Sequence, residues 1–283
     1  MLCRPLWALA GRAASLCCAR AGVVSTIYRY VVDLAARHSA PGARLLDYGC
    51  GGGEVVSLAL DAGFDASGVE EFYEGGSSYE ALQSGPEEIR RRVHALQEGV
   101  IPFDDDAFDI VVSNQVFEHI EDFTLPLREI DRVLKPGGCF INLFPTQEVW
   151  REGHIGIPFA HWFPRGSRLR YFYASALRIL GFGYNKSGSS VTQWSERSLD
   201  WIDKWTWYKP YRDVVQQFAG YFDHRELGAD YLRYRLAAHP RLKALAPAAK
   251  LEVFTPLLDY LCTRLSGRVF VMRSRPHGHG GRR

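Results

Sequence analysis

The chain has 283 residues, enough for one large domain with an insertion and too few to favour two independent domains. Hydrophobic residues make up 47% and charged residues 23%, which excludes a largely disordered chain and a disulfide scaffold. The formal net charge is +2 with both signs interspersed, so the sequence offers no basic face for nucleic acid. We therefore expect a small-molecule partner and no nucleic acid, and the sequence leaves the oligomeric state open.

The cysteines and the N-terminal arginines bear on the cellular compartment. The six cysteines form no CxxC pair and no Cys/His spacing suited to zinc, so we expect reduced thiols and a cytoplasmic protein. Arg4, Arg12, Arg20 and Arg29 precede the first acid, Asp33, which keeps an organelle-targeting segment as the alternative. Arg12 interrupts the leading apolar run, which is too short for a membrane span.

The first half of the chain has the pattern of an α/β fold. From Ile27 to Arg37 the apolar residues recur every three or four positions, which predicts a helix, and Pro41-Gly42 ends it. Five short apolar runs follow, separated by helical segments, and they indicate parallel strands joined by right-handed crossovers. These runs are Arg44–Tyr48, Ala66–Val69, Val93–Leu96, Asp109–Ser113 and Cys139–Phe144.

The second half departs from this pattern. Residues 147–213 mix glycine, proline, histidine and aromatic residues, which predicts an aromatic-rich cap or lid inserted after strand five. Val214–Arg225 and Arg268–Arg273 are interpreted as strands six and seven. The predicted fold is a Rossmann-like, seven-stranded, mostly parallel sheet with helices on both faces. The predicted parts are an N-terminal helical segment (1–42), a core (43–146), the lid (147–213), the completion of the sheet (214–275) and a disordered tail (276–283).

A glycine-rich loop, Gly49-Cys50-Gly51-Gly52-Gly53, joins the first strand to a helix that begins near Glu54. Glycines permit positive φ and bring backbone N–H groups close to a ligand at a helix start. A dinucleotide enzyme would carry G-x-G-x-x-G, but Glu54 stands at the third glycine, where a carboxylate would oppose a pyrophosphate. Asp47, just before the loop, suits a ligand with an ammonium group.

An acid at the end of the second strand is the next candidate. Glu70 follows Gly49 by 21 residues, a position from which a carboxylate accepts hydrogen bonds from ribose hydroxyls. Glu71 is the competing choice.

Four motifs in this order resemble the class I S-adenosylmethionine-dependent methyltransferases with a methyltransferase-11/25-like domain. They are the glycine loop at 45–54, the Pro-Phe turn and strand at 101–113, the segment 116–120 and the turn 132–138. The resemblance covers about residues 43–146. It implies S-adenosyl-L-methionine as the cofactor and methyl transfer as the activity.

The resemblance also implies roles for individual residues. The methionine portion of the cofactor would be held by the loop, the ribose by Glu70, the adenine edge by a turn after strand three, and the sulfonium by residues after strand four. The implied cofactor-binding residues are Asp47, Gly49, Cys50, Gly51, Gly53, Glu70, Glu98, Gly99, Asn114 and Gln115.

His119 is the candidate catalytic residue. A sulfonium methyl group is already activated, so the protein must mainly orient the acceptor. We expect a hydroxyl acceptor on a glycan precursor, a lipid or a secondary metabolite, for which a general base contributes roughly 10²- to 10⁴-fold. His119 follows strand four and has a suitable pKa, and a structural histidine is the alternative. His154, His161 and Trp162 in the lid are expected to face the acceptor.

Other functions remain as alternatives. Relatives that methylate quinone precursors hold a divalent metal with acids and a histidine near Glu118-His119, but Gln115 stands where an acid is expected, so we expect no metal. Enzymes that methylate planar nitrogens typically carry Asn/Asp-Pro-Pro-Tyr/Phe after strand four, whereas this chain has Ser113-Asn114-Gln115-Val116. A catalytically silent binding module is the remaining alternative, and the intact glycine loop argues against it.

Overall fold

The computed structural model describes residues 25–72 and 77–275. Its centre is a seven-stranded sheet in the order β3-β2-β1-β4-β5-β7-β6, which confirms the predicted fold class. The strands are β1 (Arg44–Tyr48), β2 (Asp65–Glu70), β3 (Val93–Ala95), β4 (Phe108–Asn114), β5 (Leu134–Phe144), β6 (Phe222–Glu226) and β7 (Arg268–Ser274).

Strand direction places the ends of the central strands side by side. β1 pairs in parallel with both β2 and β4, so that Asp47 lies opposite Gly68 on one side and Val112 on the other. β3 and β5 continue the parallel order, and β7 runs opposite to the other six strands, pairing antiparallel with β5 and β6. The carboxyl ends of five parallel strands therefore meet at one edge, where open α/β sheets bind their ligands.

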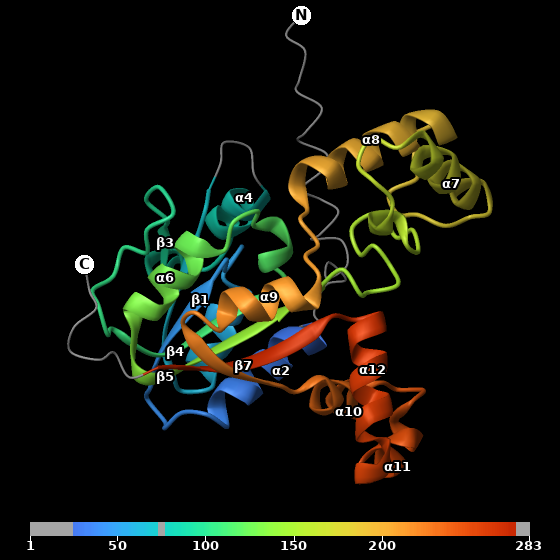
Figure 1. Ribbon diagram of the computed structural model, residues 1–283. Coiled ribbons are helices and arrows are strands. Elements are labelled where there is room, and N and C mark those ends of the chain that lie inside the picture. The colour runs from blue at the N-terminus through green and yellow to red at the C-terminus, as the bar shows by residue number, and fades with distance from the viewer. Residues whose placement is uncertain (1–24, 73–76, 276–283) are drawn as a thin grey trace, which may run out of the picture.

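Helices cover both faces of the sheet (Figure 1). One face is covered by α2 (Thr26–Ala36), α3 (Glu54–Asp61), α10 (Gly228–Ala238) and α12 (Thr255–Leu265), and Tyr30, Val56 and Cys262 belong to its buried core. The opposite face is covered by α6 (Thr124–Val133) and α9 (Tyr211–Phe218), and its core is rich in phenylalanine. The smaller helices are α4 (Ser77–Ser84), α5 (Glu87–Arg92) and α11 (Ala246–Ala249). Because helices cover both faces of the sheet, the apolar runs of its first strands are continuous and do not alternate with polar residues.

The segment between β5 and α9 forms a separate unit that projects from the sheet (Figure 1). It contains η3 (Ala160–Trp162), α7 (Arg168–Ile179) and α8 (Val191–Trp205), and we keep the name lid for residues 147–213. Its small core is built around Trp194, whose Nε1 donates to the carbonyl oxygen of Tyr184 at 2.7 Å. A capping box of Ser190 and Gln193 begins α8.

One strand assignment was wrong. Residues 214–218, predicted as the start of strand six, belong to α9, and the strand itself is Phe222–Glu226. Val214 and Phe218 are four residues apart and both fully buried, which is the spacing of a helix that lies on the sheet. β6 is an edge strand that needs only one buried anchor, Phe222, so its sequence carries little strand pattern.

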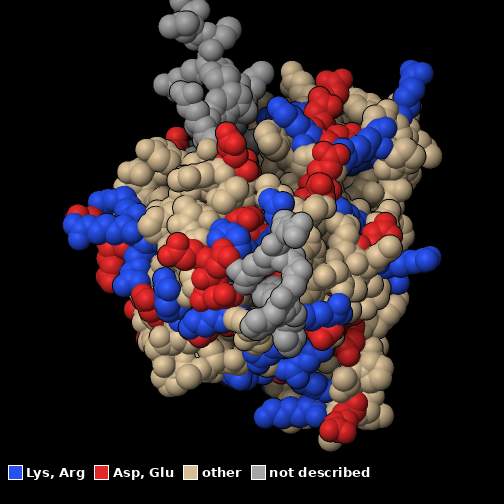
Figure 2. Space-filling view, turned by 60° about the vertical axis from the view of Figure 1, so that its left-hand side comes forward, with Lys and Arg blue, Asp and Glu red and all other residues tan. Residues whose placement is uncertain are grey.

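The segment between β6 and β7 is helical but interrupted. Short 3-10 turns, η4 (Lys243–Leu245) and η5 (Glu252–Phe254), separate α10, α11 and α12. Most of the predicted N-terminal segment and the predicted disordered tail lie outside the described residues. Among the described residues, no helix has the length and apolar character that crossing a membrane requires. Acidic and basic side chains lie beside one another over the face shown in Figure 2.

Candidate active site

The glycine loop between β1 and α3 takes its shape from positive φ angles. Gly49, Gly51 and Gly53 have φ of 79°, 55° and 87°. A Cβ atom at Gly49 would come within 2.4 Å of Val116, and one at Gly53 within 2.4 Å of Ile89. A Cβ at Gly51 would meet nothing within 4 Å. Two of the glycines are therefore required by packing, while Gly51 borders open space in which a ligand can approach the backbone.

Glu70 is attached to this loop. One carboxylate oxygen accepts a hydrogen bond from the backbone N–H of Gly51 at 2.6 Å, and the other accepts one from Glu71 N–H at 3.0 Å. Each carboxylate oxygen retains a lone pair for a further donor. The neighbouring Glu71 is exposed. The geometry therefore favours Glu70 over Glu71 as the acid that faces a ligand in the loop.

Asp47 and Cys50 are buried beneath the loop. Burial raises the pKa of Asp47 well above its usual value, and Glu70 and Glu54 raise it further. A cation beside Asp47 would favour its ionised form, so the site suits the ammonium group expected from the sequence. The sulfur of Cys50 instead packs against β2, because a Cβ atom at Gly68 would come within 2.7 Å of it.

The remaining cofactor candidates lie along the same edge of the sheet. Glu98 and Gly99 form a tight turn after β3, both with positive φ. Asn114 ends β4, and its side-chain oxygen is buried without a hydrogen-bond partner. Gln115 has φ of 58°, and its backbone N–H donates to Leu143 O at 2.7 Å. An orphaned amide oxygen at the end of a central strand is a polar group that a bound ligand can satisfy.

His119 belongs to the 3-10 turn η2 (Phe117–His119) just after β4. Its Nδ1 lies 2.6 Å from the carbonyl oxygen of Trp205. Because a carbonyl oxygen only accepts hydrogen bonds, Nδ1 carries the proton and Nε2 is left as the lone-pair nitrogen. Burial lowers the pKa of His119 to about 4, with a contribution from His154. The imidazole is therefore neutral near pH 7, and it is a weak proton acceptor.

Glu118, the preceding residue, is a buried acid. Its side chain is 1% exposed, and its Oε2 has no hydrogen-bond partner. Burial raises the pKa of Glu118 to about 7. The chain leaving α8 holds η2 in place, because Trp207 N–H donates to Glu118 O at 2.6 Å and Lys209 Nζ donates to Ile120 O at 2.9 Å.

His154 approaches the same place from the lid. Its Nδ1 lies 2.7 Å from Oε1 of Glu152, a fully buried acid that also accepts hydrogen bonds from Tyr208 Oη at 2.8 Å and Ile155 N–H at 2.6 Å. Burial opposes ionisation of Glu152, but the hydrogen bond and charge of His154 outweigh it and lower the pKa of Glu152 to about 2. The same pairing raises the pKa of His154 although burial opposes its protonation.

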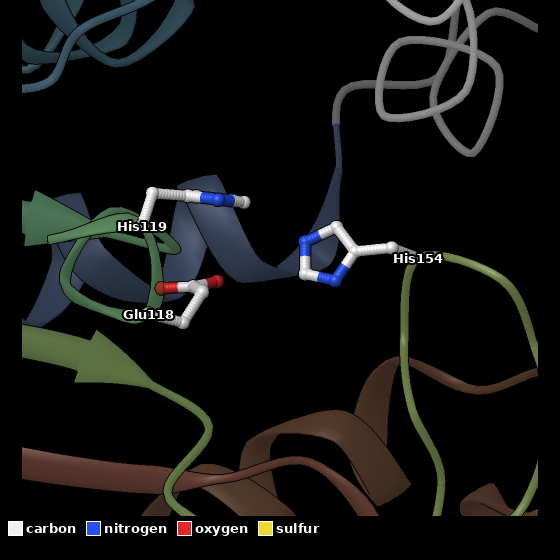
Figure 3. A group of neighbouring side chains, drawn as sticks. All are labelled: Glu118, His119 and His154. Carbon is white, nitrogen blue, oxygen red and sulfur yellow. The ribbon is translucent and has the colours of Figure 1, made fainter. Parts of the chain in front are cut away.

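Glu118, His119 and His154 thus turn toward a common space, as Figure 3 shows. Each offers one ligand atom, and these atoms all lie within 4.8 Å of one another. We call these three residues the imidazole–carboxylate cluster. The cluster joins the core, through η2, to the lid.

The other two lid candidates do not join the cluster. His161 directs Nε2 to the carbonyl oxygen of Gln147 at 3.2 Å, and its ring lies against Tyr208 with centroids 4.6 Å apart. Trp162 donates from Nε1 to the same carbonyl at 2.7 Å and is 46% exposed. Among the three lid residues singled out in the sequence, the structure therefore brings only His154 to His119.

Sequence reasoning missed three residues that orient the cluster. Glu152 and Tyr208 hold His154, and the backbone carbonyl of Trp205 holds His119. Every residue has a backbone carbonyl, so the sequence cannot identify the one that accepts from His119. Glu152 and Tyr208 are 56 positions apart in the chain. No local pattern connects them.

Residues 46–142 match a family model described as a methyltransferase domain. These residues are a class I S-adenosylmethionine-dependent methyltransferase domain. S-adenosyl-L-methionine is the cofactor of this family, and the loop geometry described above agrees with the role the sequence motifs imply for it.

Curated relatives of this methyltransferase domain include enzymes with quinones in their names. The ubiquinone biosynthesis O-methyltransferase of Paramagnetospirillum magneticum is 31% identical over 140 residues, covering 44% of this chain and 51% of that protein. The demethylmenaquinone methyltransferase of Staphylococcus haemolyticus is 28% identical over 190 residues, covering 64% and 67%. The chain spans about half the length of the ubiquinone biosynthesis relatives it matches.

A solved structure supports the fold of the methyltransferase domain and its surroundings. A chain from the complex between the Haloferax volcanii Trm112 methyltransferase activator and a methyltransferase superposes with a TM-score of 0.51. The two chains are 16% identical, and the match covers 96% of each. At that identity the similarity shows the fold alone.

Proposed function

We propose that this protein transfers a methyl group from S-adenosyl-L-methionine to a hydroxyl oxygen of a small-molecule acceptor. The observation that carries the proposal is the imidazole–carboxylate cluster, which follows β4 at the same sheet edge as the glycine loop. The cofactor would supply an activated methyl group: the sulfur–methyl bond would break as the oxygen–methyl bond forms, giving an ether and the demethylated cofactor, and the hydroxyl proton would pass to solvent water.

The chain's part at the cofactor end is binding and orientation. Gly51 offers its open backbone, Glu70 offers lone pairs fixed by two backbone N–H groups, and Asp47 offers a buried carboxyl. Gly49 and Gly53 shape the loop, and Cys50 anchors it. Glu98 and Gly99 form the turn proposed for the adenine edge. Asn114 and Gln115 would lie at the sulfonium. Such alignment supplies most of the rate enhancement when the methyl group is already activated.

The chain's part at the acceptor end is polar contact with the reacting oxygen. His119 presents an unprotonated Nε2, fixed by its hydrogen bond to Trp205. We propose that His119 is catalytic by contacting the acceptor hydroxyl, whose hydrogen bond its lone pair accepts. Its lowered pKa makes it a weak acceptor of the full proton.

The same cluster supports the proposed acceptor class. A buried carboxyl with two half-buried imidazoles suits a hydroxyl on a glycan precursor, lipid or secondary metabolite. The names of the quinone-related relatives add a phenolic precursor as a specific candidate. A cytoplasmic location, expected from the cysteines, is part of this proposal.

Two measurements on the full chain test the proposal. Titration calorimetry with S-adenosyl-L-methionine and its demethylated product should give heat of binding. Incubation with methyl-labelled cofactor and a panel of catechol, phenol, sugar and lipid-headgroup hydroxyl compounds should yield a labelled ether. Binding without transfer to any hydroxyl favours the silent module, and transfer to nitrogen alone contradicts the hydroxyl assignment.

A further inference from the structure

We infer that Glu118, His119 and His154 form a binding site for a divalent transition-metal ion of the zinc class, which bridges the domain core and the lid. Three separate features of the cluster support this inference: the orientation of both imidazoles, the unsatisfied carboxylate, and the types of donor atom.

The imidazoles are oriented as metal ligands usually are. His119 donates from Nδ1 to a backbone carbonyl at 2.6 Å, and His154 pairs through Nδ1 with the Glu152 carboxylate at 2.7 Å. Metal-binding histidines almost always use one ring nitrogen in this way, which fixes the ring and leaves the other nitrogen for the ion. In Figure 3 the free edge of the His154 ring is turned toward His119 and Glu118.

The carboxylate of Glu118 supplies the second argument. Its Oε2 is buried without any hydrogen-bond partner, and its side chain is 1% exposed. A buried polar group normally has a partner, and an unpaired one costs free energy. The ligand atoms of the three residues lie within 4.8 Å of one another, so one cation between them would satisfy Glu118 and both imidazoles.

The donor set selects the class of metal. Two imidazole nitrogens and one carboxylate oxygen are the protein ligands of many catalytic zinc sites, which keep a further position open. Magnesium and calcium prefer oxygen ligands, and the cluster offers oxygen from one residue only. Its third ligand comes from the lid, so the site differs from a set of acids within one helix.

This inference departs from the expectation that no metal binds. That expectation relied on Gln115, which replaces an acid near Glu118 in the sequence. In the structure Gln115 is exposed, and its side-chain amide donates to Leu143 O at 3.3 Å, so it does not compete for the cluster. The ligand that the segment lacks is supplied by His154, which follows His119 by 35 positions.

The consequence for catalysis depends on the proposed function, whereas metal binding itself does not. An acceptor hydroxyl at the open position would have its pKa lowered by the ion, as metal-bound water does. Nε2 of His119 would then bind the ion, and the ion would take over the contact with the acceptor hydroxyl. The ion would also tie His154, and with it the lid, to the core.

Equilibrium dialysis of the full chain with zinc chloride tests the site, after removal of metal with a chelator and without cofactor or acceptor. We expect one tightly bound zinc ion per chain by atomic spectroscopy, and no comparable binding of magnesium. His119→Ala, His154→Ala and Glu118→Gln should each weaken zinc binding more than 100-fold. Glu152→Gln, which removes the charged partner of His154, should weaken it by about 10- to 100-fold.

Two matched controls separate this site from other histidines. The double variant His277→Ala/His279→Ala removes the pair in the tail, outside the described residues, and His224→Ala removes an exposed imidazole on β6. Both should bind zinc as the wild type does. Loss of binding in the tail variant together with full binding in His154→Ala would overturn the inference.

Thermal unfolding provides a second measurement that does not require activity. Zinc should raise the unfolding midpoint of the wild type and leave that of folded Glu118→Gln, whose fold is checked by circular dichroism, unchanged. Equal shifts in both proteins would overturn the site. Zinc binding without methyl transfer would support the metal site and count against the proposed function, whereas methyl transfer by a chain that binds no zinc would do the reverse.

Discussion

The edge of the sheet at residues 44–115 and the imidazole–carboxylate cluster are positioned in different ways. At the sheet edge the functional groups are backbone amides and residues at strand ends, so their positions follow from the strand order. In the cluster the groups are side chains from η2 and the lid, fixed by Trp205, Glu152 and Tyr208. One half of the site is set by secondary structure and the other by tertiary contacts. Substitutions should therefore separate cofactor binding from turnover.

The largest effect is expected in the cluster. His119→Ala and His154→Ala should each lower turnover by about 10²-fold or more, because each would remove a side chain from the group proposed to face the acceptor hydroxyl. The affinity for the demethylated cofactor should stay within a factor of a few. Steady-state kinetics and calorimetry on the same preparations check this, with His224→Ala as the control. Equal losses of turnover and cofactor affinity would show that the two halves are not separable.

At the sheet edge, Glu70→Ala should weaken cofactor binding by about 100-fold, because ribose hydroxyls would lose a charged acceptor worth about 1.5–3 kcal/mol per hydrogen bond. The adjacent Glu71→Ala is the matched control and should change affinity little, since Glu71 is exposed. Calorimetry with the demethylated cofactor measures both. A larger loss in Glu71→Ala would reverse the assignment between the two acids.

Gly51→Ala tests whether contact with the ligand, and not backbone strain alone, makes this loop position sensitive to substitution. Gly51 (φ 55°) and Gly63 (φ 88°) both have positive φ and open space where a Cβ would lie. Alanine at either position should cost about 1 kcal/mol of stability from backbone strain. Only Gly51→Ala should also weaken cofactor binding, by about 10-fold, because its methyl group would occupy the approach to the backbone. If Gly63→Ala weakened binding equally, the loss would reflect strain and not contact.

Glu129→Gln tests the buried carboxylate that links Arg132 to the backbone of Ile101. Glu129 accepts hydrogen bonds from Arg132 at 2.7 Å and from Ile101 N–H at 3.1 Å, joining two of the sequence motifs. Burial opposes its ionisation, but these partners outweigh burial and lower the pKa of Glu129. Because the folded pKa is lowered, the stabilisation is present near neutral pH and is lost as the pH falls through that pKa.

Replacing this carboxylate should therefore cost about 1–3 kcal/mol at pH 7, measured by denaturant unfolding. The difference between wild type and Glu129→Gln should shrink in acid. A difference that grows on acidification would contradict the assignment of the lowered pKa.

The smallest effect is expected in the lid. Ser190→Ala removes the capping box at the start of α8 and should cost about 1 kcal/mol of stability, with cofactor affinity unchanged. Thr192→Ala is the control, because Thr192 is an exposed residue in the first turn of α8 and is not part of the capping box. A loss of cofactor affinity in Ser190→Ala would mean that the lid is coupled to the sheet edge.

Sequence reasoning was most successful where structure is local. The five apolar runs predicted β1 to β5, and the glycine spacing predicted a tight loop before α3, as the structure confirms. The failure at residues 214–218 has a physical cause: α9 lies on the sheet through Val214 and Phe218, and a short stretch with few apolar residues does not distinguish a helix from an edge strand.

By itself the sequence determined the fold class, the glycine loop and the strand-end acid, because short-range patterns of hydrophobicity and backbone freedom encode them. Only the tertiary structure decided which lid residue meets His119, since His154 arrives through the packing of a separate unit and is oriented by Glu152 and Tyr208. A hydrogen bond to a backbone carbonyl, such as that from His119 to Trp205, depends on where the chain runs and not on which residue it passes. The acceptor half of the site therefore required the folded chain.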